Sequence, residues 1–199
     1  EHGDHIRGVG VMARRYKLPV YMTEQTRDSL PPSVGNIADI TTFQPGGRFA
    51  VDGLQIDPFS VSHDAAEPSG FTFSRNGLKI GLATDLGIAT ALVKERLKGC
   101  RLLLLESNHD LRMLEEGPYP WPLKQRIKSR LGHLGNEASR DLLAALVHDG
   151  LSHVVLAHLS QTNNCPEKAV AAVAPALNLS RAHLTVALQD TPGPVLVIR

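Results

Sequence analysis

Two continuous apolar runs constrain the fold of this chain more strongly than any other feature of the sequence. The runs RLLLLES (101–107) and SHVVLAH (152–158) are each typical of a buried β-strand. Amphipathic segments at 122–131, 137–149 and 166–178 lie between and after them and predict helices. An alternation of short apolar strands with helices favours a mixed α/β domain.

A β-hairpin is predicted upstream of these runs. The segment FTFSRNGLKIGLATD (71–85) carries Asn76-Gly77 between alternating apolar residues, which is the strongest short-range hairpin signal. Thr23 is expected to cap a short helix that follows the first strand. The other elements expected are strands at 18–22, 47–51, 53–61, 184–188 and 195–198 and helices at 23–30, 88–98 and 109–116.

Composition excludes few classes of function. The length of 199 residues suits one domain with a sizeable core. A net charge of +1 gives no overall positive field toward nucleic acid, although a local basic patch would be hidden in that sum. No apolar run is long enough to span a membrane, and Cys100 and Cys165 are too few and too distant for a disulfide scaffold. We expect a cytoplasmic protein with reduced thiols and no membrane partner.

Six residues form a candidate set of metal ligands. Three of them end predicted strands, in DPFSVSH, KIGLATD and SHVVLAH, and three lie in EHGDHI at residues 1–6. Each alone is more typical of a hydrogen-bonded histidine or a capping aspartate, but six at comparable positions indicate a metal site. Imidazole and carboxylate groups are natural ligands of zinc, manganese and iron. The set is His2, Asp4, His5, His63, Asp85 and His158.

The order HxDH, His, Asp, His resembles the metallo-β-lactamase superfamily, whose motif is HxHxDH followed by three later ligands. The segments SHDAAEPSGFTF, GLATDLG, LLLLESNHDLRML, GPYPWPLKQRIKSRLGHLGN and LAHLSQTNNCPEKA together resemble its YycJ/WalJ-like branch of bacterial DNA-processing hydrolases. The resemblance implies an αββα four-layer sandwich. The first motif histidine would stand immediately before Glu1, after several strands of the first sheet. We therefore expect residues 1–199 to be a single, N-terminally truncated domain with an incomplete first sheet.

The resemblance also implies two divalent ions, zinc or manganese, with iron as a further option. It implies that the first ion is held by His2 and His63, the second by Asp4, His5 and His158, and that Asp85 bridges both. With one histidine absent, the first site is expected to be weakened. Asp4 would also orient the nucleophilic water. Glu1 could replace the absent ligand, but on an extended segment its side chain is expected to point away.

Two further histidines fall in segments that resemble the same branch. His109 in ESNHD and His133 in GHLGN would support the ligands or contact the scissile phosphate. Capping of a helix is an equal alternative for both. After His158, the run SQTNN would donate hydrogen bonds to a phosphate, or would simply form a polar turn.

The segment WPLKQRIKSR (121–130) places basic and aromatic side chains on one predicted helix. Such a stretch is able to follow a nucleic-acid backbone and stack a base, but most charged stretches are solvated helix faces. With the family resemblance the two interpretations are about even. The candidate DNA-binding residues are Trp121, Lys124, Arg126, Lys128 and Arg130.

The leading hypothesis is a metal-dependent phosphodiesterase that acts on DNA, as an exonuclease working from a 5′ end. One alternative is a hydrolase of small substrates, such as a cyclic phosphodiester or a lactone, because one scaffold hosts many chemistries. Another is a catalytically impaired domain that binds nucleic acid or a protein partner. A second copy of the chain, in a homo-oligomer, could cover an open sheet edge.

Overall fold

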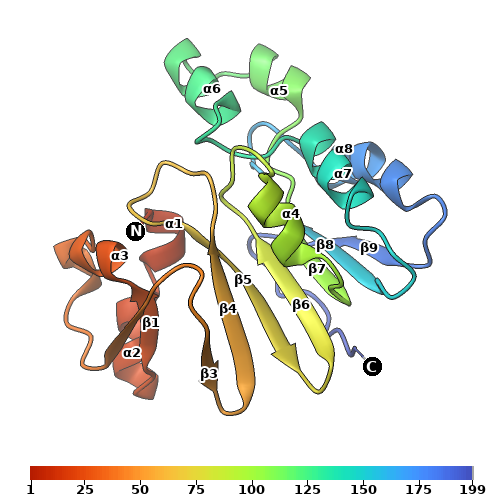
Figure 1. The fold of residues 1–199 in the computed structure, drawn as a ribbon. Helices are drawn as coiled ribbons and strands as arrows, with labels where there is room; N and C mark the ends of the chain where they lie inside the picture. Colours follow the sequence, from red (N-terminus) through yellow and green to blue (C-terminus); the bar gives the residue numbers. More distant parts are fainter. Residues whose placement is uncertain (199) are drawn as a thin grey trace.

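The computed structural model describes residues 1–198 and is built around one seven-stranded mixed sheet (Figure 1). The strand order is β3-β4-β5-β6-β7-β8-β9, with antiparallel pairing from β3 to β6 and parallel pairing from β6 to β9. The strands are β3 (Phe49–Val51), β4 (Leu54–Ser60), β5 (Ser69–Arg75), β6 (Leu78–Ala83), β7 (Leu102–Glu106), β8 (His153–Ala157) and β9 (His183–Val186).

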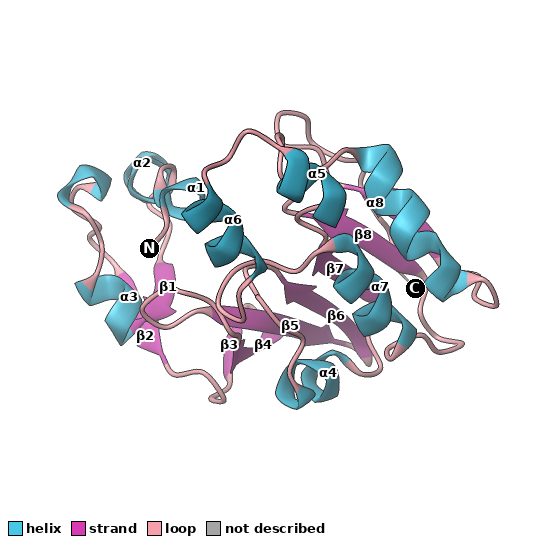
Figure 2. Ribbon diagram, turned by 90° about the horizontal axis from the view of Figure 1, so that it is seen from above, coloured by secondary structure: helices cyan, strands magenta, loops and turns pink. Residues whose placement is uncertain are grey.

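Helices cover one face of this sheet. They are α4 (Ala91–Leu97), α7 (Asn136–Ala144), α8 (Pro166–Val173) and the 3-10 turn η2 (Ala174–Leu177). Alternate residues of the strands point to them, so Leu103 and Leu105 of β7 are fully buried in the main core with Leu156 of β8. Figure 2 shows α7 and α8 lying together against the β7–β8 part of the sheet. Two short helices, α5 (Leu111–Glu116) and α6 (Trp121–Lys128), connect β7 to α7.

A second, smaller core forms from the first 43 residues. Its elements are α1 (Gly3–Ile6), α2 (Val9–Tyr16), β1 (Val20–Thr23), α3 (Glu24–Asp28), the 3-10 turn η1 (Pro32–Val34) and β2 (Ile40–Phe43). Strands β1 and β2 pair in parallel as a separate two-stranded sheet. Met22 of β1 packs with Ile6 and Ala13 of the helices in this core.

Aromatic rings join the two sheets. Tyr21 of β1 stacks on Phe49 of β3 at 5.1 Å between ring centroids, and Phe43 of β2 contacts Phe71 of β5 at 5.8 Å. Because Tyr21 and Met22 alternate along β1, one faces the large sheet and the other faces the helices. The molecule therefore has four layers. Helices α4, α7 and α8 form the first, the large sheet the second, the small sheet the third, and helices α1 and α2 the fourth, which is the expected αββα arrangement.

Local sequence signals are confirmed where turn and cap chemistry decides the structure. Asn76 and Gly77 adopt φ values of 51° and 78° between β5 and β6, as a tight hairpin turn requires. The Thr23 side chain accepts a hydrogen bond from the Thr26 amide and caps α3.

The strand predicted at 195–198 is wrong, since the segment joins no sheet. Pro192 and Pro194 precede it and lack the amide hydrogens that a ladder needs.

No helix among residues 1–198 has both the length and the apolar character needed to cross a membrane.

Candidate metal centre

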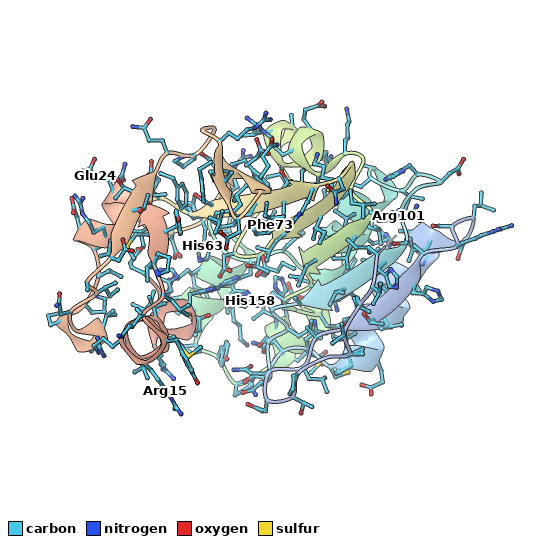
Figure 3. The ribbon with its side chains drawn as sticks, turned by 90° about the horizontal axis from the view of Figure 1, so that it is seen from below. Arg15, Glu24, His63, Phe73, Arg101 and His158 are labelled. Carbon is cyan, nitrogen blue, oxygen red and sulfur yellow. The ribbon has the colours of Figure 1, made fainter. Side chains whose placement is uncertain are left out.

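Four strands deliver polar side chains to one edge of the large sheet. Strands β6, β7 and β8 are parallel, and β4 runs in the same direction as β6 because each is antiparallel to β5. His63, Asp85 and His158 follow β4, β6 and β8 and therefore meet at the same edge. Figure 3 shows His63 and His158 at this end of the sheet and Arg101 toward the other end. Asp85 and His158 have φ values of 56° and 58°, so both turns are sharp and hold a left-handed conformation.

The first residues of the chain reach this edge as a helical turn. The chain at Glu1 was expected to lie in an extended segment, but residues 3–6 directly after it form the helical turn α1. The His2 carbonyl accepts hydrogen bonds from the amides of His5 and Ile6, so His2 stands at the N-terminus of that turn. This geometry sends the side chain of His2 toward His63, whereas Asp4 and His5 project toward His158.

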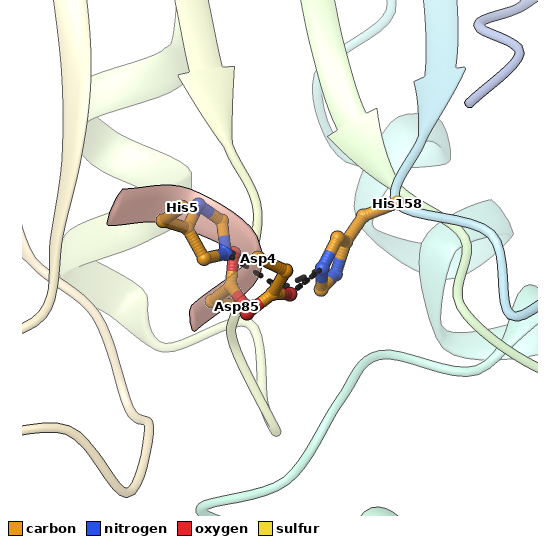
Figure 4. A group of neighbouring side chains, drawn as sticks. All are labelled: Asp4, His5, Asp85 and His158. Atoms are coloured by element: carbon orange, nitrogen blue, oxygen red, sulfur yellow. Dashed lines mark hydrogen bonds and ion pairs between the residues drawn. The ribbon is translucent and has the colours of Figure 1, made fainter. Parts of the chain in front are cut away.

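One cluster contains two acids and two histidines (Figure 4). Asp4 Oδ2 lies 3.2 Å from His158 Nε2 and 3.6 Å from His5 Nε2. Asp85 Oδ2 lies 3.1 Å from His5 Nε2, and Asp85 Oδ1 lies 3.7 Å from His158 Nε2. Ligand atoms on one tetrahedral zinc ion are about 3.3 Å apart, because each lies roughly 2.0–2.1 Å from the metal. The donor set therefore fits a divalent ion.

A second cluster lies on the other side of Asp85. His63 Nε2 is 3.3 Å from His2 Nδ1 and 3.7 Å from Asp85 Oδ1. His63 Nδ1 donates a hydrogen bond to the Gly132 carbonyl at 2.9 Å, so Nε2 presents its lone pair to the cluster. Asp85 Oδ1 is thus 3.7 Å from both His63 Nε2 and His158 Nε2, and Oδ2 faces His5, so one carboxylate lies between the two groups of histidines, where a bridging ligand would stand.

A buried carboxylate that the sequence analysis did not single out holds two of the histidine rings. Glu106 ends β7 and is 0% exposed. Its Oε1 accepts hydrogen bonds from His158 Nδ1 at 2.7 Å and from His133 Nδ1 at 2.8 Å. Its Oε2 accepts from the amides of Leu86 and Leu134, each at 3.0 Å. The available signal was an acid at the end of the apolar run LLLLE, because a charged residue is rarely buried unless it is paired.

Charges within the site shift the proton affinities of its members. Burial alone would lower the pKa of His158, but the hydrogen bond to Glu106 and the charges of Asp85 and Glu106 raise it to about 9. Burial would raise the pKa of Asp85, but the His5 hydrogen bond and the charges of His158 and His5 hold it well below its usual range. Without an ion, protonated imidazoles neutralise the acids. Metal binding therefore requires the release of protons.

Comparison with known proteins places this arrangement in a family. Residues 1–159 match the family described as a beta-lactamase superfamily domain. The chain belongs to the metallo-β-lactamase superfamily. Members of this superfamily bind divalent metal ions, and the two clusters around Asp85 fit that chemistry.

Two curated relatives of the chain are exodeoxyribonucleases by name. The chain is 42% identical over 171 residues to exodeoxyribonuclease YycJ of Bacillus anthracis, covering 85% of the chain and 65% of the relative. It is 35% identical over 173 residues to exodeoxyribonuclease WalJ of Streptococcus pneumoniae, covering 85% of the chain and 64% of that relative. The chain thus spans just under two thirds of the length of these relatives.

Solved structures show the superfamily fold. The metallo-β-lactamase fold protein YhfI from Bacillus subtilis aligns with a TM-score of 0.67 at 15% identity, over 94% of this chain and 71% of that one. Zinc-bound PqqB from Methylobacterium extorquens aligns with a TM-score of 0.67 at 21% identity, over 94% of this chain and 65% of that one.

The structure separates the two histidines that were grouped as catalytic candidates. The His133 ring lies between His63 and His158, with centroid distances of 4.9 and 5.2 Å, and it lines the open cleft. His109 is 5% exposed, and the residues that line this cleft do not include it. Burial lowers the pKa of His109 to about 4, so its ring is neutral at physiological pH.

An open cleft of about 990 Å³ lies over the cluster of Asp4, His5 and His158. Tyr119 and Leu123 line one side of it, beside and on α6. The polar run after His158 lines another part with Ser160, Gln161, Thr162 and Asn164. A second cavity of about 290 Å³ lies on the side of His2 and His63, between β1 and the large sheet.

Helix α6 carries most of the predicted basic side chains, but two of them form ion pairs with acidic side chains. Arg126 lines the cleft and pairs with Asp64, and Lys128 pairs with Glu115 at 3.0 Å. Lys124 donates to a backbone carbonyl of the same glutamate at 2.8 Å. Trp121 is 71% exposed, and Arg130 is exposed just beyond the helix. The structure brings only Arg126 of these five to the cleft wall.

Proposed function

We propose that the chain is a metal-dependent phosphodiesterase domain that degrades DNA as an exonuclease in the cytoplasm. The observation that carries the proposal is the position of Asp85, whose carboxylate lies between His63 on one side and His5 and His158 on the other, beside an open cleft. The names of the curated relatives support DNA as the substrate.

The proposed ligand roles follow the two clusters. His2 and His63 would hold one ion, Asp4, His5 and His158 the other, and Asp85 would bridge them. Zinc or manganese fits these nitrogen and oxygen donors. A pair of such ions polarises a phosphodiester and lowers the pKa of water at the site.

The protein side chains orient the reactants and move protons. Asp4 is 59% exposed at its side chain, so it reaches the cleft, where its carboxylate can orient an attacking water. His133 has its Nδ1 committed to Glu106, which leaves Nε2 as the ring atom that can exchange a proton with substrate in the cleft. His109 would act indirectly, by supporting the loop that carries His133, because its carbonyl accepts a hydrogen bond from the Asn136 amide.

The substrate is tested by comparing a polymer with a small ester. The purified chain, loaded with zinc or manganese, is assayed on linear DNA, on closed circular DNA and on bis(p-nitrophenyl) phosphate. An exonuclease degrades only the linear DNA, and Asp85→Asn abolishes both DNA and ester hydrolysis. No hydrolysis of any DNA by a fully metal-loaded chain would contradict the proposal.

Helix α6 distinguishes a nuclease from a small-substrate hydrolase. The double variant Lys124→Ala/Lys128→Ala should reduce DNA cleavage, and weaken its dependence on salt, without slowing hydrolysis of the small ester. Lys94→Ala/Lys98→Ala removes the same charge from the exposed surface of α4 and its end and serves as the matched control. If the α6 variant keeps both DNA cleavage and hydrolysis of the small ester unchanged, a small-ester hydrolase is favoured instead.

A further inference from the structure

A third candidate ligand stands beside His2 and His63. Asp64 Oδ1 lies 3.5 Å from His63 Nε2 and 3.9 Å from His2 Nε2, whereas His63 Nε2 faces Nδ1 of the same His2 ring. One donor atom from each of the three residues lies within 4.8 Å of the others. The family resemblance assigns His2, His63, the motif histidine that would stand before Glu1 and the shared Asp85 to this side of the site, so Asp64 is an additional donor.

The carboxylate of Asp64 has one committed oxygen and one without a partner. Oδ2 accepts a hydrogen bond from Arg126 Nε. Oδ1 is buried and has no hydrogen-bond partner among the described residues. Leaving a buried acceptor without a partner is unfavourable, and more so when the acceptor is charged. The free oxygen Oδ1 faces the two histidines.

The backbone explains how two consecutive residues both face the cluster. Consecutive side chains of a strand point to opposite sides, but residues 63–67 form a bend after β4. This bend is fixed to the loop after α6, because the Asp64 amide donates to the Leu131 carbonyl and His63 Nδ1 donates to the Gly132 carbonyl. Asp64 is therefore held in place by contacts that do not depend on a metal.

We propose that Asp64 is a protein ligand of the metal site formed by His2 and His63. Asp85 Oδ1 lies 3.7 Å from His63 Nε2, so this side of the site would have two imidazole nitrogens and two carboxylate oxygens, donors that zinc accepts. Arg126 connects the carboxylate of Asp64 to α6 and the cleft wall. This inference rests on the proposed dinuclear centre.

Metal content, measured without any activity assay, tests the inference. Elemental analysis after dialysis gives the number of ions per chain, and titration with Co²⁺ monitored by visible absorption gives affinity and coordination. We expect about two ions in the unaltered chain. Asp64→Ala should lower the affinity for one of the two ions. Loss of a residue that only hydrogen-bonds to a ligand typically lowers affinity by roughly 10–100-fold, and the loss of a ligand should exceed that. His158→Ala should lower the affinity for the other ion.

Three further variants separate ligation from folding. Asp64→Asn keeps a carbonyl for Arg126 but loses the charge, and it should behave as Asp64→Ala. Asp64→His should restore binding of the weakened ion. Asp149→Ala, which removes an exposed acid elsewhere, should bind two ions as the unaltered chain does. Far-ultraviolet circular dichroism confirms that each variant is folded.

Three results would overturn the inference. If Asp64→Ala binds two ions with unchanged affinity, Oδ1 is hydrated and is no ligand. If the unaltered chain and Asp64→Ala each bind one ion equally well, the first site does not form, and the proposed function still stands on the second cluster. Absence of any ion from every folded variant would overturn both the inference and the proposed function.

Discussion

Replacing Glu106 by glutamine tests whether the buried carboxylate positions the two histidines. The change keeps the size and shape of the side chain but supplies one oxygen and one NH₂ group. The structure requires acceptors at both ends, since Oε1 receives His133 and His158 and Oε2 receives two backbone amides. In either orientation of the amide, two donors therefore face an NH₂ group.

The cost follows from the number of donors left without an acceptor. Each unsatisfied buried donor costs about 1–3 kcal/mol, so two of them predict a loss of about 2–6 kcal/mol, less if the rings rotate. For a chain of this size, a loss of 2 kcal/mol lowers the melting temperature by roughly 4–8 °C. If the histidine rings rotate to find other acceptors, metal affinity falls instead, because loss of the hydrogen bond that orients a ligand typically lowers affinity by about 10–100-fold.

Both quantities are measured on the same preparation. Urea unfolding of the metal-free protein gives the free energy of unfolding, and a competitive zinc titration gives the affinity of the cluster that contains His158. Glu115→Gln, an exposed glutamate in α5, is the matched control and should change neither quantity. The reasoning would be refuted if Glu106→Gln left the free energy of unfolding within about 0.5 kcal/mol of the unaltered chain and left the zinc affinity unchanged.

Three other predictions concern stability. Burial lowers the pKa of His109 to about 4, below the ordinary 6.5, so only the unfolded chain gains a proton here between those values. The free energy of unfolding should therefore fall by up to about 3 kcal/mol as the pH drops from 6.5 to 4. His109→Gln should reduce the dependence of this free energy on pH, measured by urea unfolding. An equal dependence in both proteins would contradict a lowered pKa for His109. Leu105→Ala should destabilise the core by about 2–5 kcal/mol, whereas the exposed Leu92→Ala should stay within about 0.5 kcal/mol. Divalent zinc at 100 times its dissociation constant should stabilise the chain by about 2.7 kcal/mol over the chelated form, and identical melting curves would contradict a native-state metal site.

Several elements were predictable because their signals are local. The alternating residues of β5 and β6 and the Asn76-Gly77 turn specify a hairpin within 15 residues. The apolar runs that became β7 and β8 are long enough to be strands buried in a core. The prediction at 195–198 failed because a short apolar run does not by itself supply a neighbouring strand. Helices α1 and α2 and strand β2 were not predicted at all, since they are short and gain their stability from the smaller core.

By itself, the sequence determined which residues stand at strand ends and that their chemistry suits a metal. His63, Asp85 and His158 were identified in this way, together with the first histidines of the chain. Only the tertiary structure decided that β4 and β6 run in the same direction, so that these residues share one edge. It also decided that Glu106 holds His133 and His158, and that Asp64 turns toward His2. The physical reason is that side-chain periodicity records which face a residue occupies, whereas contacts between residues 20 to 150 positions apart depend on how the whole chain packs.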